Sequence, residues 1–341
     1  MTNADVLSPA GLSISVIVCT YNRSASLAAT LESLAASQLP ASVPWEVMVV
    51  DNNSTDTTRE VVETFRRRHP QVFRYLFEPR SGKSNALNTG IKHAQGKVLA
   101  FVDDDVTVES TWLHHLTASL HDEEWSGAGG RILPARAFGR PAWFSLEELG
   151  GILFGHFDFG DQPRELGRAP FGANMAFRKE MFERYGGFQV DLGPGPDPGT
   201  TRLNEDTEFG RRLISAGERL RYEPSAAVYH PVAPDRLNQK FFLVWWFDYG
   251  RSRVREHKRR SKVWGINRDY ARISKDLLLH LPLATGRWMF SLSPKERFRH
   301  KCGVWHTAGR IAESCHRAFY AAKPQEWPRR VRRNDPQRNE V

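Results

Sequence analysis

The chain has 341 residues, 40% of them hydrophobic and 26% charged, a composition that permits a buried core and excludes a disordered or collagen-like chain. Three scattered cysteines are too few for a disulfide framework or a zinc site, so we expect reduced thiols in a cytoplasmic protein. Neither a run of 18 apolar residues nor a basic start followed by an apolar segment occurs, which predicts no membrane-spanning helix and no secretory signal.

The formal net charge of +9 is unevenly distributed along the chain. Residues 241–341 carry 23 Lys and Arg against 9 Asp and Glu, whereas residues 1–240 carry 25 against 30. A basic C-terminal part indicates contact with a polyanion, either an anionic membrane or a nucleic acid, unless it is a solvated surface.

The first 110 residues alternate between two kinds of pattern. Strand-like runs, apolar on both faces, lie at residues 14–18, 47–50, 73–77 and 98–102. Helical patterns lie between them at about residues 24–37, 57–68 and 84–94. Buried strands separated by helices predict an α/β fold with a mostly parallel sheet and helices on both faces.

The pattern weakens after residue 128, and the Gly/Pro-rich segment 192–199 is predicted to be a loop. A helix at about 206–216 and short strands at 220–222 and 227–229 follow. We predict four regions: a flexible start (1–12), an α/β domain (13–235), a basic, aromatic helical extension (236–323) and a disordered tail (324–341).

Polar residues follow three of the predicted strands. The first strand leads into Thr20, Tyr21 and Arg23, the second into Asp51 and Asn53, and the fourth into three aspartates. Because ligands bind at the carboxyl ends of strands in open parallel sheets, these side chains are expected to share one crevice.

Two nucleotide-binding motifs are excluded by their spacing. The first strand is not followed by the Gly-x-Gly-x-x-Gly of dinucleotide-binding folds. Gly82-Lys83-Ser84 resembles the end of a P-loop, but Phe77 stands where that motif needs glycine. Lys83, at a predicted helix start, can still approach a phosphate.

Asp103, Asp104 and Asp105 form the sharpest local signal. Adjacent carboxylates repel one another unless a cation or hydrogen-bond donors compensate. Mg²⁺ and Mn²⁺ take oxygen ligands and bridge carboxylates to diphosphates. The alternative is that the aspartates cap a helix over residues 106–116, which explains one carboxylate better than three.

Asp206 and His230 leave two interpretations open. Asp206 starts a predicted helix under the Gly/Pro loop, where it is either an N-cap or a general base. His230 ends a strand-like run and is either a structural histidine or a metal ligand.

The ordered motifs resemble those of family 2 glycosyltransferases, inverting enzymes with the GT-A fold. The resemblance extends over about residues 13–235. It depends on these segments: 16–23 (VIVCTYNR), 49–56 (VVDNNSTD), 82–90 (GKSNALNTG), 101–105 (FVDDD), 172–178 (GANMAFR), 186–188 (GGF) and 205–206 (ED).

The resemblance implies a nucleotide-sugar donor, expected to be a UDP-sugar, and a divalent metal, Mn²⁺ or Mg²⁺. The implied nucleotide-sugar ligands are Thr20, Tyr21, Arg23, Asp51, Asn53, Lys83, Asp103 and Asp104. The implied metal ligands are Asp105 and His230, and the implied contacts to the donor sugar or acceptor are Asn174, Arg178 and Glu205. Asp206 would be the catalytic base of a single in-line displacement that inverts the anomeric centre.

The resemblance also implies transfer of one sugar rather than polymerisation, because Arg287-Trp288 lacks the Gln of the processive Gln-x-x-Arg-Trp motif. Two other classes stay open. A nucleotidyltransferase would need a Gly-rich basic loop after the first strand, which the chain lacks, and a non-catalytic nucleotide-sugar-binding scaffold would not need Asp51, Asp105 and Asp206 together.

The C-terminal hundred residues combine aromatic and basic segments. Residues 241–247 (FFLVWWF) precede a basic run that continues to residue 262, which favours a helix in an anionic membrane interface over one that packs on the domain. The resemblance adds a carbohydrate or lipid-linked acceptor and a location on the inner face of the plasma membrane. A later helix, with one apolar face from Phe298 to Phe319, is expected to pack on the domain. No motif supports nucleic-acid binding.

Overall fold

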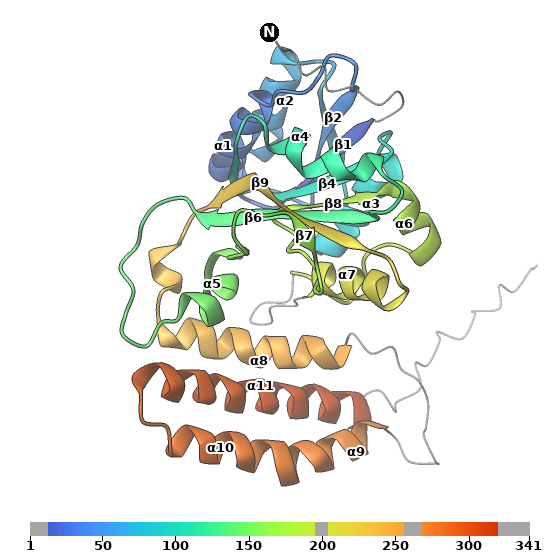
Figure 1. The fold of residues 1–341 in the computed structure, drawn as a ribbon. Coiled ribbons are helices and arrows are strands. Elements are labelled where there is room, and N and C mark those ends of the chain that lie inside the picture. The colour runs from blue at the N-terminus through green and yellow to red at the C-terminus, as the bar shows by residue number, and fades with distance from the viewer. Residues whose placement is uncertain (1–12, 195–203, 256–267, 320–341) are drawn as a thin grey trace, which may run out of the picture.

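The computed structural model describes residues 13–194, 204–255 and 268–319 (Figure 1). The predicted flexible start at 1–12 and tail at 324–341 lie outside these residues, as does most of the Gly/Pro loop. Figure 1 shows an α/β part that contains the sheet, and below it a layer of long helices formed by the C-terminal residues.

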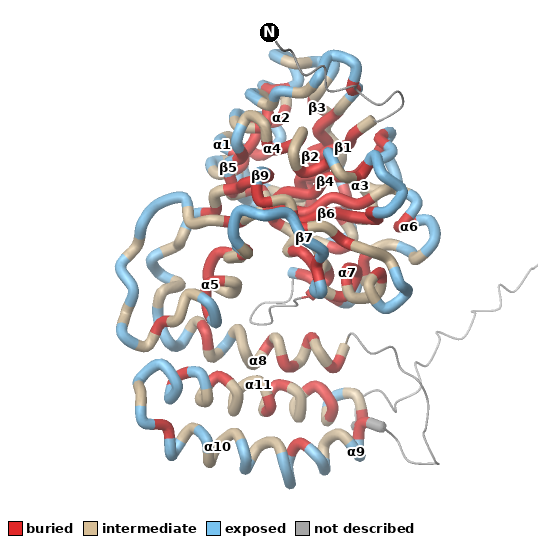
Figure 2. The backbone as a smooth tube through the Cα atoms, in the orientation of Figure 1, coloured by how far each residue is buried: buried red, intermediate tan, exposed pale blue. Residues whose placement is uncertain are grey.

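The first half of the sheet is parallel, as the sequence predicts. Its strands are β1 (Ile14–Thr20), β2 (Trp45–Asp51), β3 (Phe73–Phe77) and β4 (Val98–Asp103). They lie in the order β3-β2-β1-β4, and their carboxyl ends therefore share one edge. Nearly all residues of β1, β2 and β4 are buried (Figure 2), because helices pack against the sheet.

The helices between these strands begin close to their predicted positions. They are α1 (Ser24–Ala35), α2 (Thr58–Arg68) and α3 (Lys83–His93). The Asp56 carboxylate accepts hydrogen bonds from the N–H groups of Thr58 (3.0 Å) and Ser24 (2.9 Å), the first residues of α2 and α1. Hydrogen bonds from Thr58 and Ser24 lower the pKa of Asp56 to about 2. One side chain thus fixes the starts of two helices.

The second half of the sheet is mixed. Its strands are β5 (Thr107–Val108), β6 (Gly127–Pro134), β7 (Arg164–Glu165), β8 (Met175–Arg178) and β9 (Leu220–His230). β8 runs antiparallel between β4 and β6, and β9 lies beyond β6. The sequence predicts two short strands within β9; the structure has one, whose pairing with β6 is irregular around Pro224, a residue without an N–H group.

Shorter helices complete the α/β part: α4 (Trp112–Thr117), η1 (Ala118–His121), α5 (Leu146–Phe154), α6 (Lys179–Tyr185), α7 (Glu205–Ser215) and η2 (Pro234–Arg236). A helix over 106–116 is wrong, because residues 107 and 108 pair with β9 and α4 begins only at Trp112. Asp103, Asp104 and Asp105, at the end of β4, therefore do not cap a helix.

The C-terminal helices form layers below the sheet. They are α8 (Gln239–Arg255), α9 (Arg268–Lys275), the π-helical turn η3 (Asp276–His280), α10 (Leu281–Met289) and α11 (Pro294–Phe319). α11 packs against α8 on one side and against α9 and α10 on the other (Figure 1). The boundary predicted after residue 235 stays a prediction.

Two glycines bring α8 and α11 into backbone contact. A Cβ on Gly250 would overlap the backbone oxygen of His306, and a Cβ on Gly309 would overlap that of Phe247.

Within the part of the chain that the structure describes, no helix is both long and apolar enough to cross a bilayer.

A second hydrophobic core joins the helical layer to the α/β part. Phe242 of α8 is fully buried and packs against Trp143 and Phe144, with ring centroids 5.7 and 6.0 Å apart. Phe298 of α11 packs against the same Trp143 at 4.8 Å. The start of α8 is thus anchored to the α/β part, although the sequence favours a membrane-facing helix there.

Candidate active site

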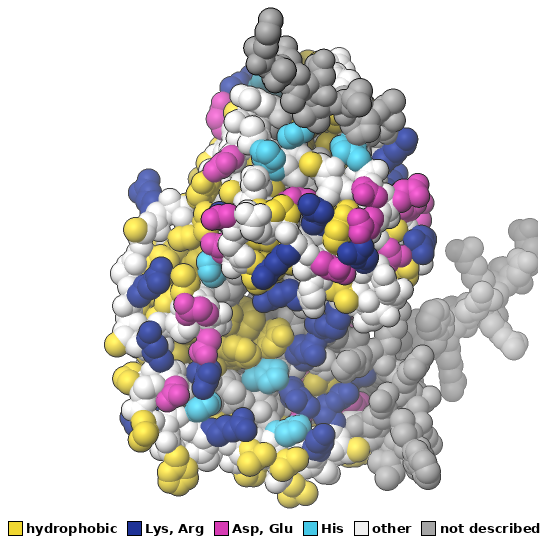
Figure 3. Space-filling model, in the orientation of Figure 1, with side chains coloured by type: hydrophobic (Ala, Val, Ile, Leu, Met, Phe, Trp, Pro, Cys, Tyr) yellow, Lys and Arg dark blue, Asp and Glu magenta, His cyan; other side chains and the backbone are white. Residues whose placement is uncertain are grey.

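A cavity of about 560 Å³ lies where β1, β2 and β4 end. Side chains from these strand ends form one side, and α5, η2 and α8 contribute the opposite side. Figure 3 shows hydrophobic side chains, with Lys and Arg beside them, in a hollow between the sheet and the lower helices. Nine of the predicted site residues line the cavity: Thr20, Tyr21, Arg23, Asn53, Lys83, Asp103, Asp104, Asp105 and His230.

The turn after β1 presents an aromatic ring to the cavity. Asn22 has a φ of 51°, in the left-handed region that asparagine tolerates better than most residues. Its side-chain oxygen accepts a hydrogen bond from the Thr55 N–H (2.7 Å), which ties the β1 turn to the β2 loop. Tyr21 is 57% exposed beside this turn and is free to stack on a flat ligand.

Asp51 is buried and does not line the cavity, although Asn52 and Asn53 beside it do. Its carboxylate accepts hydrogen bonds from the Ser54 N–H and the Tyr75 hydroxyl, both at 2.9 Å. A carboxylate has about four acceptor positions, so Asp51 retains capacity for a further donor.

Asn52, which the sequence reasoning missed, organises the loop before α3. Its amide donates to the backbone oxygens of Glu78 (2.9 Å) and Arg80 (2.8 Å), and its oxygen accepts from the Gly82 N–H (2.7 Å). These bonds hold the loop in the conformation that starts α3 at Lys83. The signal was present in the sequence as an asparagine pair at a strand end.

Lys83 is the cation at the centre of the site. Its ammonium donates to Asp103 at 2.7 Å and lies 3.6 Å from a carboxylate oxygen of Glu205. Burial disfavours the charged amine, but attraction to Asp103 and Glu205 outweighs it and holds the pKa of Lys83 well above its usual value. Lys83 is therefore a fixed positive charge.

The three aspartates at the end of β4 have different environments. Burial alone would raise the pKa of Asp103, but Lys83 outweighs it and holds that pKa low. Burial raises the pKa of Asp104 to about 6, although Arg23 opposes the shift. Asp105 makes an ion pair with Arg23 at 2.6 Å and faces the cavity.

His230 completes a set of metal-ligand atoms. Its Nε2 lies 3.4 Å from an Asp105 oxygen, and its Nδ1 lies 2.9 Å from the backbone oxygen of Pro231. One ligand atom each from Asp103, Asp105 and His230 lie within 4.8 Å of one another. Two carboxylates and an imidazole suit Mn²⁺, and an orienting carbonyl on the other ring nitrogen is typical of ligand histidines.

Asp206 lies close to the Lys83 ammonium. One oxygen accepts from the Gly172 N–H at 2.7 Å, and a Cβ on Gly172 would lie 3.3 Å from that oxygen and 3.6 Å from the Lys83 ammonium. Glu205 precedes it, and burial raises the pKa of Glu205 although Lys83 opposes the shift. Neither carboxylate lines the main cavity, but both neighbour its central cation.

Two predicted sugar contacts, Asn174 and Arg178, do not line the cavity. Asn174 is fully buried, where its amide oxygen accepts from the Trp112 indole (2.8 Å) and its nitrogen donates to the backbone oxygens of Arg131 and Ala226. It therefore has a structural role. Arg178 pairs with Val98, at the start of β4, so five residues of about 3.3 Å each separate it from the site.

α8 supplies an apolar wall of the cavity, whereas the sequence favours a membrane interface for this aromatic segment. Phe241, Val244 and Trp245 line the cavity together with Ile152 of α5. The Trp245 ring stacks on Tyr249, with centroids 5.0 Å apart and an angle of 12° between the rings. The aromatic run was visible in the sequence, but the sequence does not say which surface the helix faces.

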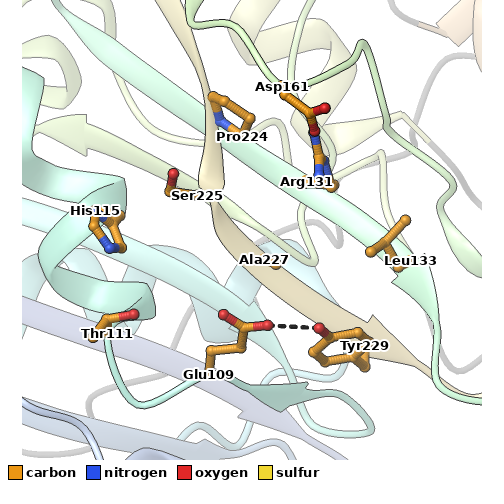
Figure 4. Close-up of a pocket in the computed structure, with 10 residues that line it drawn as sticks. All are labelled: Glu109, Thr111, His115, Arg131, Leu133, Asp161, Pro224, Ser225, Ala227 and Tyr229. Carbon is orange, nitrogen blue, oxygen red and sulfur yellow. Dashed lines mark hydrogen bonds and ion pairs between the residues drawn. The ribbon is translucent and has the colours of Figure 1, made fainter.

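A second hollow, between β5, β6 and β9, is polar (Figure 4). Glu109 accepts a hydrogen bond from the Tyr229 hydroxyl at 2.6 Å, and Arg131 pairs with Asp161 at 2.7 Å. Its charged groups thus interact within the protein, and we assign it no ligand.

Solved structures with a similar architecture identify the fold. The mannosyltransferase PcManGT from Pyrobaculum calidifontis aligns with a TM-score of 0.57 over 90% of this chain and 87% of that chain, at 18% identity. GalNAc-T7 aligns with a TM-score of 0.51 over 71% of this chain and 51% of that chain, at 17% identity. The fold is that of GT-A glycosyltransferases with a helical C-terminal region.

Sequence comparison identifies the family. The model of Glycosyl transferase family 2 matches residues 15–186. Succinoglycan biosynthesis protein ExoM of Rhizobium meliloti is 31% identical over 238 residues, 69% of this chain and 70% of that protein. Glucosyl-dolichyl phosphate glucuronosyltransferase of Haloferax volcanii is 28% identical over 70% of this chain and 76% of that protein. The chain belongs to glycosyl transferase family 2 and is a glycosyltransferase.

Proposed function

We propose that the protein transfers one sugar, with inversion, from a nucleotide-sugar, expected to be a UDP-sugar, to a hydroxyl of a carbohydrate or lipid-linked acceptor. The observation that carries the proposal is the cluster of Asp103, Asp105 and His230 in one cavity with the strand-end polar residues. The PcManGT structure is a complex with GDP-Man and Mn²⁺, and the GalNAc-T7 structure contains UDP, GalNAc and Mn²⁺, which supports this donor class.

In this proposal the nucleotide lies at the ends of β1 and β2. Tyr21 stacks on the base, and Asp51 accepts from a ring N–H of the base. Asp103 contacts the ribose, and Lys83 stabilises the negative charge of the diphosphate. A divalent ion held by Asp105 and His230, when bound, offsets the charge that develops on the departing diphosphate.

Asp206 is the proposed catalytic base. It takes the proton of the acceptor hydroxyl as that oxygen bonds to C1 of the sugar, while the bond from C1 to the diphosphate oxygen breaks. A nucleoside diphosphate is a good leaving group, so the second carboxylic acid that glycosidases use is not required.

The acceptor is proposed from the apolar wall and from relatives. ExoM is named for succinoglycan biosynthesis, and the Haloferax relative is named for glucosyl-dolichyl phosphate, a lipid-linked sugar. Phe241 and Trp245 offer apolar surface to such an acceptor. Membrane association through 241–262 stays a prediction, and residues 256–262 lie outside the described residues.

Calorimetric titration of UDP, GDP and dTDP, each with and without Mn²⁺, tests the donor site. We expect one nucleotide to bind at least about tenfold more tightly with Mn²⁺, and Asp105→Asn to remove that gain. Asp161→Asn, on an exposed residue of the polar hollow, is the matched control. Absence of binding by every nucleotide would contradict the proposal.

Asp206→Asn tests the base. Release of nucleoside diphosphate in the presence of saccharide or lipid-linked acceptors should fall about 100-fold or more, with nucleotide affinity unchanged. An unchanged turnover number would show that another group takes the proton.

A further inference from the structure

We propose that residues 277–292 form a surface that docks on an anionic lipid bilayer. Seven large apolar side chains make up this surface, called here the outer apolar face: Leu277, Leu278, Leu279, Leu283, Met289, Phe290 and Leu292. Leu278, Phe290 and Leu292 are 81%, 82% and 94% exposed. Single exposed apolar residues are ordinary, but a cluster of this kind in one segment marks an interaction surface.

The segment is polar inside and apolar outside. Asp276, which precedes the three leucines, is fully buried and makes an ion pair with Arg310 of α11 at 3.0 Å. It also accepts from His280 at 2.7 Å. A helix of a water-soluble protein normally buries its leucines and exposes its charges. The reverse arrangement is expected where the surroundings of the helix are themselves apolar.

Basic residues surround the outer apolar face. Residues 275–301 contain six Lys and Arg against two Asp and Glu, and one of the two acids is the buried Asp276. Lys275, Arg287 and Arg297 are exposed. Figure 3 shows hydrophobic side chains along the lower edge of the molecule, with Lys and Arg side chains just above them. Such a surface suits lipid headgroups that carry negative charge.

Aromatic residues near the face have the arrangement of an interfacial belt. The Lys301 ammonium lies 5.7 Å from the centre of the Trp288 ring and 5.8 Å from that of Trp305. Tryptophan and lysine together favour the boundary between acyl chains and water. The helices would therefore lie in the interface, with the apolar face turned toward the acyl chains.

The charge pattern favours a bilayer over a second copy of the chain. A two-fold interface through this face would bring the same basic residues of two copies together, and like charges in contact oppose association. The inference goes beyond the proposed function, because it uses no residue of the cavity.

Sedimentation of the full chain with vesicles tests the proposal. Vesicles of phosphatidylcholine alone are compared with vesicles of equal parts phosphatidylcholine and phosphatidylglycerol. We expect binding to the anionic vesicles, and a loss of roughly tenfold or more in partitioning for the triple variant Leu278→Ser, Phe290→Ser, Leu292→Ser. The control is Val190→Ser, an exposed apolar residue of the α/β part, which should bind like the wild type.

Charge reversal separates the electrostatic contribution to vesicle binding from the apolar one. Arg287→Glu with Arg297→Glu should remove the preference for anionic vesicles. Nucleotide titration of each variant shows that the chain is folded, and it keeps failure of this inference distinct from failure of the proposed donor site. Equal sedimentation of the triple variant and the wild type would overturn the proposal. The proposal would also be overturned if the wild type bound neither kind of vesicle. That outcome includes a wild type that forms a dimer instead, with the dimer lost in the triple variant.

Discussion

Alanine at Gly309 and at Gly303, both inside α11, should change the stability of the protein in opposite directions. A Cβ on Gly309 would overlap the backbone oxygen of Phe247 in α8, whereas a Cβ on Gly303 meets nothing within 4 Å. Alanine is intrinsically favoured over glycine inside a helix by about 1 kcal/mol. That gain is common to both positions, so the difference between them measures the helix contact.

At Gly309 the overlap should outweigh the intrinsic gain. Overpacking a tight contact costs about 1–3 kcal/mol, and a backbone oxygen cannot rotate away as a side chain would. We expect Gly309→Ala to destabilise the protein by up to about 2 kcal/mol and Gly303→Ala to stabilise it by about 0.5–1 kcal/mol.

Urea denaturation followed by circular dichroism measures both free energies of unfolding. Displacement of α8 in Gly309→Ala should also raise the KM for the acceptor, because Trp245 moves with the helix, and should leave nucleotide affinity unchanged. If Gly309→Ala unfolds at the same urea concentration as Gly303→Ala, or at a higher one, the backbone contact between α8 and α11 does not exist as described.

Three further predictions concern the site and its support. Lys83→Met should destabilise the protein by about 2 kcal/mol at neutral pH, because Asp103 and Glu205 lose their cation. The loss of stability should become smaller toward pH 5, because the folded variant takes up protons on these two carboxylates. Urea denaturation at a series of pH values measures both effects. Asp56→Ala should cost about 1–2 kcal/mol at pH 7 through the two helix starts, in the same assay. This contribution is present above the ordinary pKa of an aspartate, near 4, and should vanish as the pH falls toward 2, because the folded-state pKa is lowered. Trp245→Ala should raise the acceptor KM several-fold in steady-state kinetics, with nucleotide affinity unchanged.

Each of the three has an outcome that contradicts its reasoning. A Lys83→Met deficit that grows as the pH falls would mean that the carboxylates are not the groups left uncompensated. If the effect of Asp56→Ala did not depend on pH, the negative charge of Asp56 would not be what stabilises the two helix starts. An unchanged acceptor KM for Trp245→Ala would separate the apolar wall from acceptor binding.

The donor half of the cavity was predictable because parallel strands bring their carboxyl ends to one edge. Thr20, Asn53 and Asp105 are far apart in the sequence, yet strand and helix alternation alone predicts that they meet. Asp51 does not line the cavity, because its carboxylate accepts hydrogen bonds from Ser54 and Tyr75, and its contact with the nucleotide stays a prediction.

The sequence is less informative where the direction of a strand or helix face, rather than its composition, decides the structure. β8 is antiparallel to β4, and this reversal carries Arg178 to the opposite edge of the sheet from Asp103. The aromatic run at the start of α8 contains no information on which neighbour covers it, so the sequence alone does not decide between a membrane and the α/β part for Phe242 and Trp245. In the structure, contacts between residues far apart in the sequence place Phe242 in the second hydrophobic core and Trp245 in the cavity wall.

The apolar wall of the cavity also bears on how such enzymes diversify. The family model ends at residue 186, whereas Arg236, Val244 and Trp245 enter the cavity from beyond it. Under the proposed function, the residues that handle the donor lie at or before His230, whereas most of the apolar wall offered to the acceptor comes from residues 236–245, so the two are encoded in separable stretches of the gene. An exchange of the C-terminal helices between relatives would be a direct route to a new acceptor with the old donor.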